Sequence, residues 1–246
     1  MRIFRLLIGG LLIYLMSIDA RANIVLGGTR LIYPGGEREV TLPLSNKGAT
    51  PALVQSWMDD GATDSTPENS TAPFLIMPPI TRIEGQASQT LRILYNGTAL
   101  PEDRESLFWL NVLEIPPVTP GSKDKNNLLV AIQSRIKVFY RPAKLSMPLH
   151  DAAKHLKWKL LNKGGKWVLH SRNTSGLYIS FGSVYVARAG KVFSNKDGIY
   201  MVAPGGQQTF DVQADTAPVL PVKDGEVQFD YINDYGALKT VSSAVD

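Results

Sequence analysis

The chain has 246 residues, of which 44% are hydrophobic and 20% charged, with 21 glycines and 16 prolines. This composition excludes low-complexity and collagen-like chains and is typical of a globular protein. At this length two domains of about 100 to 120 residues are expected, each large enough to bury a core of its own. The chain has no cysteine, which excludes disulfides, thiolate metal sites and a cysteine nucleophile.

The first 22 residues form a predicted export signal. Two arginines precede an apolar run over residues 6–16, and Ala-Arg-Ala at residues 20–22 supplies the small residues of a cleavage site. The alternative is a membrane anchor, but the run is shorter than the roughly 20 apolar residues that span a bilayer. We therefore expect residues 1–22 to be removed, so that the mature, exported chain begins at Asn23.

The remaining composition argues against a nucleic-acid partner and against catalysis. Loss of the signal removes three arginines and one aspartate and so lowers the formal net charge from +4 to +2. The densest group of lysines, within residues 154–166, alternates with leucine and tryptophan as in a hairpin with its apolar side chains inward. The three histidines lack the HExxH spacing, and no GxSxG, Walker or dinucleotide-binding motif is present. We therefore predict no enzyme, metal, cofactor or small-molecule substrate.

From Asn23 onward, alternating apolar and polar residues predict short strands rather than helices. The breaks between them are turn sequences, such as Tyr-Pro-Gly-Gly at residues 33–36 and Met-Pro-Pro at residues 77–79. Seven strands within about 120 residues indicate an immunoglobulin-like sandwich. The predicted strands are residues 24–26, 30–32, 40–44, 53–57, 90–95, 106–113 and 128–140.

A second series of strands follows Pro142, which cannot donate to a strand ladder and therefore ends the preceding strand. The sequence thus predicts an all-β protein with two immunoglobulin-like domains, residues 23–142 and 145–246. The strands predicted for the second domain are residues 156–160, 166–170, 177–181, 183–187, 209–212, 226–232 and 238–241.

Four motifs resemble the signature of the periplasmic pilus-assembly chaperones, the PapD-like family. In chain order they are TR at residues 29–30, LPEDRESLFWLNVLEIP at 100–116, IKVFYRP at 136–142 and YINDYG at 231–236. The resemblance implies two immunoglobulin-like domains set at an angle, with a cleft between them that receives a pilus or fimbrial subunit. It also implies a binding function in the periplasm, with delivery of the subunit to an outer-membrane usher.

The family resemblance identifies residues 128–140 as the strand that the chaperone lends to an incomplete subunit. Leu128, Val130 and Ile132 are alternate residues and share one face, which is predicted to enter the groove of the subunit. Their neighbour Leu129 is predicted to face the chaperone's own core. The bare sequence also fits a doubly buried strand of an ordinary sandwich, and the motif match decides between the two interpretations.

The resemblance assigns Arg30 and Lys137 as the paired cations that hold the C-terminal carboxylate of the subunit. Lys137 lies five residues beyond Ile132, so strict alternation places it on the opposite face. We therefore expect a bulge or strong twist near residues 134–136. The resemblance further implies an interdomain salt bridge formed by three side chains: Glu105, Arg141 and Asp234.

The segment of residues 118–127 is short, and it resembles the subgroup of the family that serves rod-like pili or fimbriae. An apolar strand that awaits a subunit also gives the free chaperone a surface through which it can self-associate. The main alternative is a secreted immunoglobulin-like adhesin or receptor-type binding module. Such modules usually repeat or carry an anchor, and neither feature is seen in the sequence.

Overall fold

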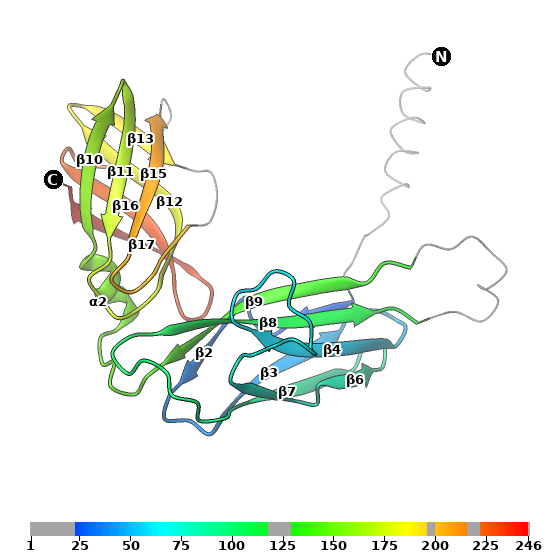
Figure 1. Ribbon diagram of the computed structural model, residues 1–246. Helices are drawn as coiled ribbons and strands as arrows, with labels where there is room; N and C mark the ends of the chain where they lie inside the picture. The colour runs from blue at the N-terminus through cyan, green and yellow to red at the C-terminus, as the bar shows by residue number, and fades with distance from the viewer. Residues whose placement is uncertain (1–22, 118–128, 196–199, 216–221, 246) are drawn as a thin grey trace, which may run out of the picture.

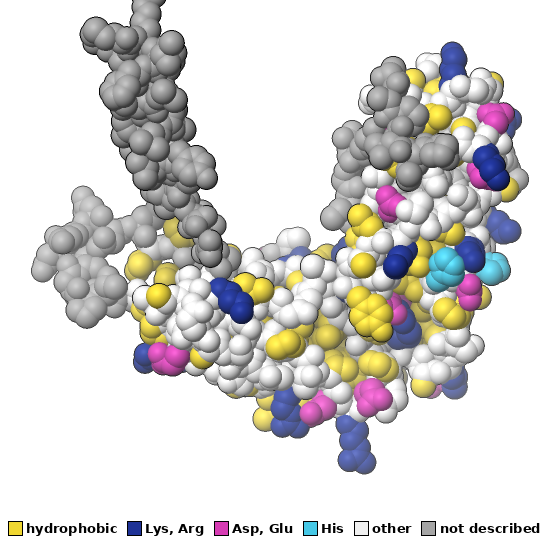
Figure 2. All heavy atoms as spheres, turned by 180° about the vertical axis from the view of Figure 1, so that it is seen from behind, with side chains coloured by type: hydrophobic (Ala, Val, Ile, Leu, Met, Phe, Trp, Pro, Cys, Tyr) yellow, Lys and Arg dark blue, Asp and Glu magenta, His cyan; other side chains and the backbone are white. Residues whose placement is uncertain are grey.

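The computed structural model describes residues 23–117, 129–195, 200–215 and 222–245. Apart from the short helix α2 (Leu149–Lys154), all its elements are β-strands. Two domains lie at a marked angle, with the second rising from one end of the first (Figure 1). In the space-filling view of Figure 2 the two domains enclose a concave angle. No helix of the described residues is long and apolar enough to cross a membrane.

The first domain is a sandwich of two sheets with the strand orders β1-β3-β7-β5 and β2-β9-β8-β4-β6. Leucine, isoleucine and valine side chains from both sheets, among them Leu44, Leu91 and Leu110, are fully buried between them. The strands are β1 (Ile24–Leu26), β2 (Arg30–Pro34), β3 (Glu39–Asn46), β4 (Ala52–Asp59), β5 (Phe74–Met77), β6 (Ile80–Ile83), β7 (Ser88–Tyr95), β8 (Ser106–Ile115) and β9 (Ile132–Arg141).

The second domain is built on one curled sheet of order β10-β11-β15-β13-β12-β16-β17, with β14 paired to β12. An aromatic cluster fills its core, and the ring centroids of Trp158 and Phe229 lie 4.9 Å apart. This architecture confirms the prediction of two immunoglobulin-like sandwiches. The strands are β10 (Lys157–Lys163), β11 (Lys166–Arg172), β12 (Ile179–Arg188), β13 (Lys191–Asn195), β14 (Met201–Val202), β15 (Gln207–Ala214), β16 (Glu226–Ile232) and β17 (Leu238–Ala244).

The second domain differs from the prediction in three respects, the first being that β13 and β14 were not predicted. β12 is a single strand where the sequence predicted two, and its pairing with β16 shifts register between Phe181 and Val184. Gly182 and Ser183 fill this irregularity, which a sequence pattern cannot distinguish from a turn. Helix α2 was not predicted, because six residues are too few to show a helical period.

β9 carries most of the predicted site, and its pairing contradicts the predicted bulge. Its register with β8 runs without interruption from the Glu114–Ile132 pair to the Ser106–Tyr140 pair. Val138 therefore faces the core of the first domain, and Lys137 faces the opposite side of the sheet. β9 therefore alternates regularly, and Ile132 and Lys137 lie on opposite faces of the sheet.

Candidate functional site

Arg30 and Lys137 lie side by side close to the junction of the two domains. β2 and β9 are parallel, and Arg30 is directly opposite Lys137 in their register. Nη1 of Arg30 donates a hydrogen bond to the carbonyl oxygen of Ile232 in the second domain, at 3.2 Å. Nζ of Lys137 lies 5.5 Å from the centroid of the Trp109 ring. The fold thus brings together the two cations that the resemblance paired.

The surroundings of these two cations compensate their charge only in part. Burial lowers the pKa of the Arg30 guanidinium, and the carboxylates of Asp234 and Glu105 oppose that shift. Burial also lowers the pKa of the Lys137 ammonium, and the charge of Arg30 lowers it further. Within the described residues neither cation forms an ion pair, and Nε of Arg30 is buried without a hydrogen-bond partner. An anion that reaches both would therefore be stabilised.

Arg141, at the end of β9, joins an acid of each domain. Its Nε donates to Oε1 of Glu105 at 2.7 Å, and its two terminal nitrogens donate to both oxygens of Asp234 at 2.7 and 2.8 Å. Glu105 is 3% exposed, and its second oxygen accepts the backbone N–H of Tyr178 from the second domain at 2.7 Å. The three side chains therefore form one network across the junction.

The pKa shifts in this network follow from burial and from the partners. Burial by itself lowers the pKa of Arg141, but the hydrogen bonds to Asp234 and the charge of Glu105 outweigh it, and the pKa is raised. Burial raises the pKa of Glu105, against the opposing effects of Arg141 and of the Tyr178 N–H. Arg141 is therefore a fixed cation, whereas Glu105 takes up a proton more readily than an exposed glutamate.

Two glycines allow the domains to approach closely at this network. Gly236 has φ +83°, a conformation that L-residues rarely adopt, and a Cβ there would collide with Oγ1 of Thr29. A Cβ at Gly176 would lie 2.7 Å from the carbonyl oxygen of Asp103. The contact of Gly236 with Thr29 gives a physical reason for the TR and YINDYG motifs, which lie far apart in the sequence.

β9 has one free edge next to the two cations. β8 pairs with the whole of β9, whereas β2 pairs only with residues 137–141 on the other side. No strand of the described residues pairs with residues 132–136 on that side. Their backbone N–H and C=O groups therefore form an open template for a further strand.

Both domains match known protein families. The family described as pili and flagellar-assembly chaperone, PapD N-terminal domain, matches residues 23–146. The family described as pili assembly chaperone PapD, C-terminal domain, matches residues 151–243. The chain belongs to the PapD-like family of pilus-assembly chaperones. The resemblance seen in the four motifs is thereby confirmed.

The similarity of this chaperone to its relatives extends over both domains. Chaperone protein MrkB of Klebsiella pneumoniae is 41% identical over 229 residues, which cover 91% of this chain and 92% of MrkB. The Pseudomonas aeruginosa CupB2 chaperone structure has a TM-score of 0.73 at 38% identity and covers 90% of this chain and 100% of that chain. A chain of the Salmonella enterica SafA pilin–SafB chaperone complex has a TM-score of 0.71 at 29% identity, with coverages of 92% and 98%.

The start of β9 and the exposure of Leu129 differ from the prediction. β9 begins at Ile132, not at residue 128, and Leu128 lies outside the described residues. Val130 is 59% exposed and Ile132 is 41% exposed. Leu129, which was predicted to face the chaperone's core, is 56% exposed. The reason is that the last pair of the ladder is Glu114–Ile132, so the segment extends beyond the core.

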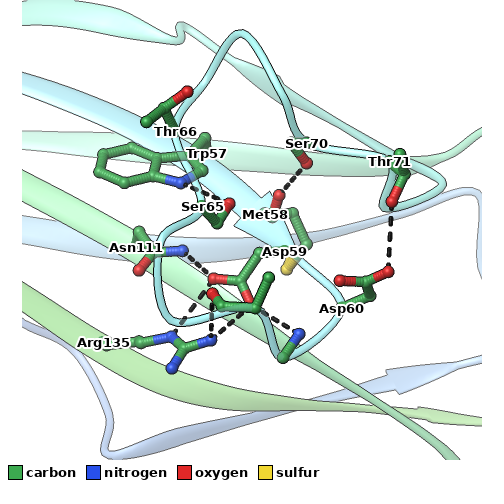
Figure 3. Close-up of polar contacts among 12 residues, drawn as sticks. Trp57, Met58, Asp59, Asp60, Ser65, Thr66, Ser70, Thr71, Asn111 and Arg135 are labelled. Carbon is green, nitrogen blue, oxygen red and sulfur yellow. Dashed lines mark hydrogen bonds and ion pairs between the residues drawn. The ribbon is translucent and has the colours of Figure 1, made fainter.

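A polar cluster that the sequence did not predict lies on the same face of the sheet as Lys137. Figure 3 shows three of its members, Asp59, Asn111 and Arg135. Asp59, at the end of β4, is 2% exposed and pairs with Arg135 of β9 at 2.5 Å. Asn111 of β8 donates to the same carboxylate at 2.5 Å. No sequence spacing indicates this cluster, because its members come from three strands. Within the described parts of the chain no group of His, Asp and Glu side chains could hold a metal ion.

Proposed function

We propose that this chaperone captures a pilus subunit by lending it β9 as a missing strand, with the subunit's C-terminal carboxylate bound between Arg30 and Lys137. One observation carries the proposal. Within the described residues, the backbone edge of residues 132–136 has no partner strand, and it runs directly into the two cations, which form no ion pair there. A strand that pairs with this edge would bring a chain end to the cations without a further turn. Donor-strand complementation is a known form of strand addition to a sheet edge.

The two cations suit one carboxylate because they differ in shape. Arg30 offers a planar guanidinium fork, and Lys137 offers a compact charge on a flexible stem. Charge-assisted hydrogen bonds are roughly twice as strong as neutral ones. Because burial lowers the pKa of both groups, a bound carboxylate would regain part of the solvation that the cations lose on folding. This electrostatic gain fixes the end of the subunit and therefore the register of the added strand.

The exposed apolar residues upstream supply the second part of the binding. Val130 and Ile132 are exposed in the free chaperone, and Leu128 continues their alternation in the sequence. Burial of three such side chains in a subunit groove contributes about 1.5 to 3 kcal/mol each, or roughly 5 to 9 in total before ordering costs. Each backbone hydrogen bond nets only about 1 kcal/mol. Hydrophobic burial therefore supplies most of the affinity, and the cations set the register.

We further propose that capture takes place in the periplasm, after removal of residues 1–22, and that the subunit then passes to an outer-membrane usher. The export signal in the sequence supports the compartment. Membership of the PapD-like family supports the transfer to an usher. The Salmonella enterica structure that contains a pilin bound to the similar chaperone SafB supports the class of partner.

Co-expression with the pilus subunit encoded nearby, followed by pull-down from the periplasm, tests the proposal. The wild-type chaperone should protect the subunit from proteolysis and copurify with it, and Lys137→Ala should do neither. Lys163→Ala, which removes an exposed lysine of β10, is the matched control and should behave as the wild type. Capture by Lys137→Ala at the wild-type level would show that the carboxylate anchor is wrongly assigned.

A further inference from the structure

A row of four side chains crosses the sheet of the first domain at the level of the carboxylate anchor. Arg30 on β2 is opposite Lys137 on β9, which is opposite Trp109 on β8, which is opposite Asp59 on β4. The row therefore places a buried carboxylate at one end and the two cations of the anchor at the other. Neighbouring strands are about 4.8 Å apart, so Asp59 and Lys137 are separated by two such steps, or roughly 10 Å.

Asp59 does not use Lys137 as its partner, because Arg135 takes that place. Nη2 and Nε of Arg135 donate to the two carboxylate oxygens of Asp59 at 2.5 and 3.2 Å. Asn111 and the backbone N–H of Gly61 donate to the same carboxylate at 2.5 and 2.7 Å (Figure 3). A buried carboxylate needs such partners, because an uncompensated charge in the interior is costly. Asp59 is thus satisfied without Lys137.

Two of the cations of β9, Arg135 and Lys137, lie near the ring of Trp109. The guanidinium of Arg135 is 4.5 Å from the centroid of the Trp109 ring, and Nζ of Lys137 is 5.5 Å from it. The face of an aromatic ring attracts cations, so both side chains gain from their contact with Trp109. Lys137 is half-buried and has no ion pair within the described residues. Its ammonium is therefore held by an aromatic ring and kept free of carboxylates.

We propose that Arg135 is a positioning residue for the carboxylate anchor: it neutralises Asp59 and so keeps Lys137 unpaired and available to the subunit. The inference rests on the proposed function, since it concerns the same anchor. Without Arg135, Asp59 would be a buried carboxylate with Lys137 as the nearest other cation of the row. Arg30 is farther away and donates to Ile232. The long, flexible side chain of Lys137 would then turn to Asp59.

Three variants separate this role from a general structural one. Arg135→Gln leaves Asp59 without its cation, Asp59→Asn removes the competing charge, and the double variant combines both changes. The first readout is the pKa of the Lys137 ammonium in the free chaperone, followed by NMR titration of the lysine side chain. Arg135→Gln should raise this pKa by about one unit or more, because an opposite charge comes close. The double variant should return it to the wild-type value.

The second readout is the affinity for the subunit used in the pull-down. Arg135→Gln should weaken binding about tenfold or more, which is the loss expected when a charged hydrogen-bond donor is withdrawn. Asp59→Asn alone should bind as the wild type, and the double variant should recover binding. An unchanged Lys137 pKa in Arg135→Gln, or a double variant that binds as weakly as the single one, would overturn the inference.

The two readouts also distinguish this inference from the proposed function. If the Lys137 pKa rises and falls across the variants as expected while subunit binding never changes, Arg135 does neutralise Asp59, but Lys137 does not anchor the subunit. If Arg135→Gln fails to fold, folding of the double variant becomes the test. A double variant that folds and binds as the wild type would show that the unpaired charge of Asp59 is the defect, and one that also fails to fold would overturn the inference.

Discussion

Replacement of Arg141 by alanine should destabilise the chaperone, because it leaves the buried carboxylate of Glu105 without its cation. The side chain of Glu105 is 1% exposed and would keep only the Tyr178 N–H as a partner. Loss of one partner from a buried ion pair costs about 3 to 5 kcal/mol. Asp234 is 32% exposed and can be solvated, so its share is about 0 to 1 kcal/mol. We therefore expect a loss of about 3 kcal/mol or more, mainly from the first domain.

Urea and thermal unfolding of Arg141→Ala measure this loss, and small-angle scattering measures the angle between the domains. Arg92→Ala is the matched control, because the Arg92–Glu39 pair has the same chemistry but is 52% and 34% exposed. Its loss should leave the unfolding transition nearly unchanged, because water solvates both groups of this exposed pair. Scattering should show a broader distribution of domain angles for Arg141→Ala only, since Arg141 bonds to an acid of each domain whereas Arg92 and Glu39 both lie in the first domain.

A second substitution tests the cause of the loss. Glu105→Gln added to Arg141→Ala removes the buried charge and leaves an amide oxygen that can still accept the Tyr178 N–H. The double variant should therefore regain most of the stability. If it is as unstable as Arg141→Ala, or if Arg141→Ala unfolds like the wild type with unchanged scattering, the buried charge is not the source of the effect.

Three further predictions concern the subunit site. Lys137→Ala should abolish capture but keep or slightly raise the midpoint of thermal unfolding, because it removes a desolvated charge beside Arg30. A clear drop in that midpoint would contradict this prediction. Burial and Arg30 lower the pKa of Lys137, and a bound carboxylate would raise it again, so binding takes up protons. Affinity measured against pH should therefore fall at alkaline pH for the wild type but not for Lys137→Arg, and parallel curves would contradict the assignment. Val130→Glu should fold normally yet bind orders of magnitude more weakly, since a charge buried in the subunit costs several kcal/mol. Leu129→Glu should also fold, because Leu129 is exposed, and a larger binding loss than for Val130→Glu would reverse the proposed face.

The strands were largely predictable because alternate residues point to opposite faces of a sheet. β16 has the bounds that the pattern indicated, and β8 extends the predicted strand by two residues. β5 and β6 were missed because each has only four residues beside the Met77-Pro78-Pro79 turn. A run that short cannot show its period. Alternation also gave no measure of where the core ends, which is why the orientation of Leu129 was predicted wrongly.

The contacts of the site were harder to predict from the sequence than the strands were. Asp59 and Arg135 are 76 positions apart, and only the order of strands in the sheet brings them together. The pairing of Arg30 with Lys137 was indicated by the family resemblance and not by any local pattern. Parallel pairing of β2 with β9 is the physical cause of that proximity. The order of strands in a sheet depends on the tertiary fold, so a local sequence pattern does not indicate it.

Hydrogen exchange of the chaperone, alone and in complex with its subunit, tests the central claim most directly. In the part of the chain that the structure describes, no strand pairs with one side of residues 132–136, so alternate amides there should exchange readily in the free protein. In the complex these amides should become strongly protected, together with those of the residues just upstream, because the subunit supplies the missing neighbour strand. Unchanged exchange at residues 132–136, with protection confined to another part of the chaperone, would contradict capture along this edge.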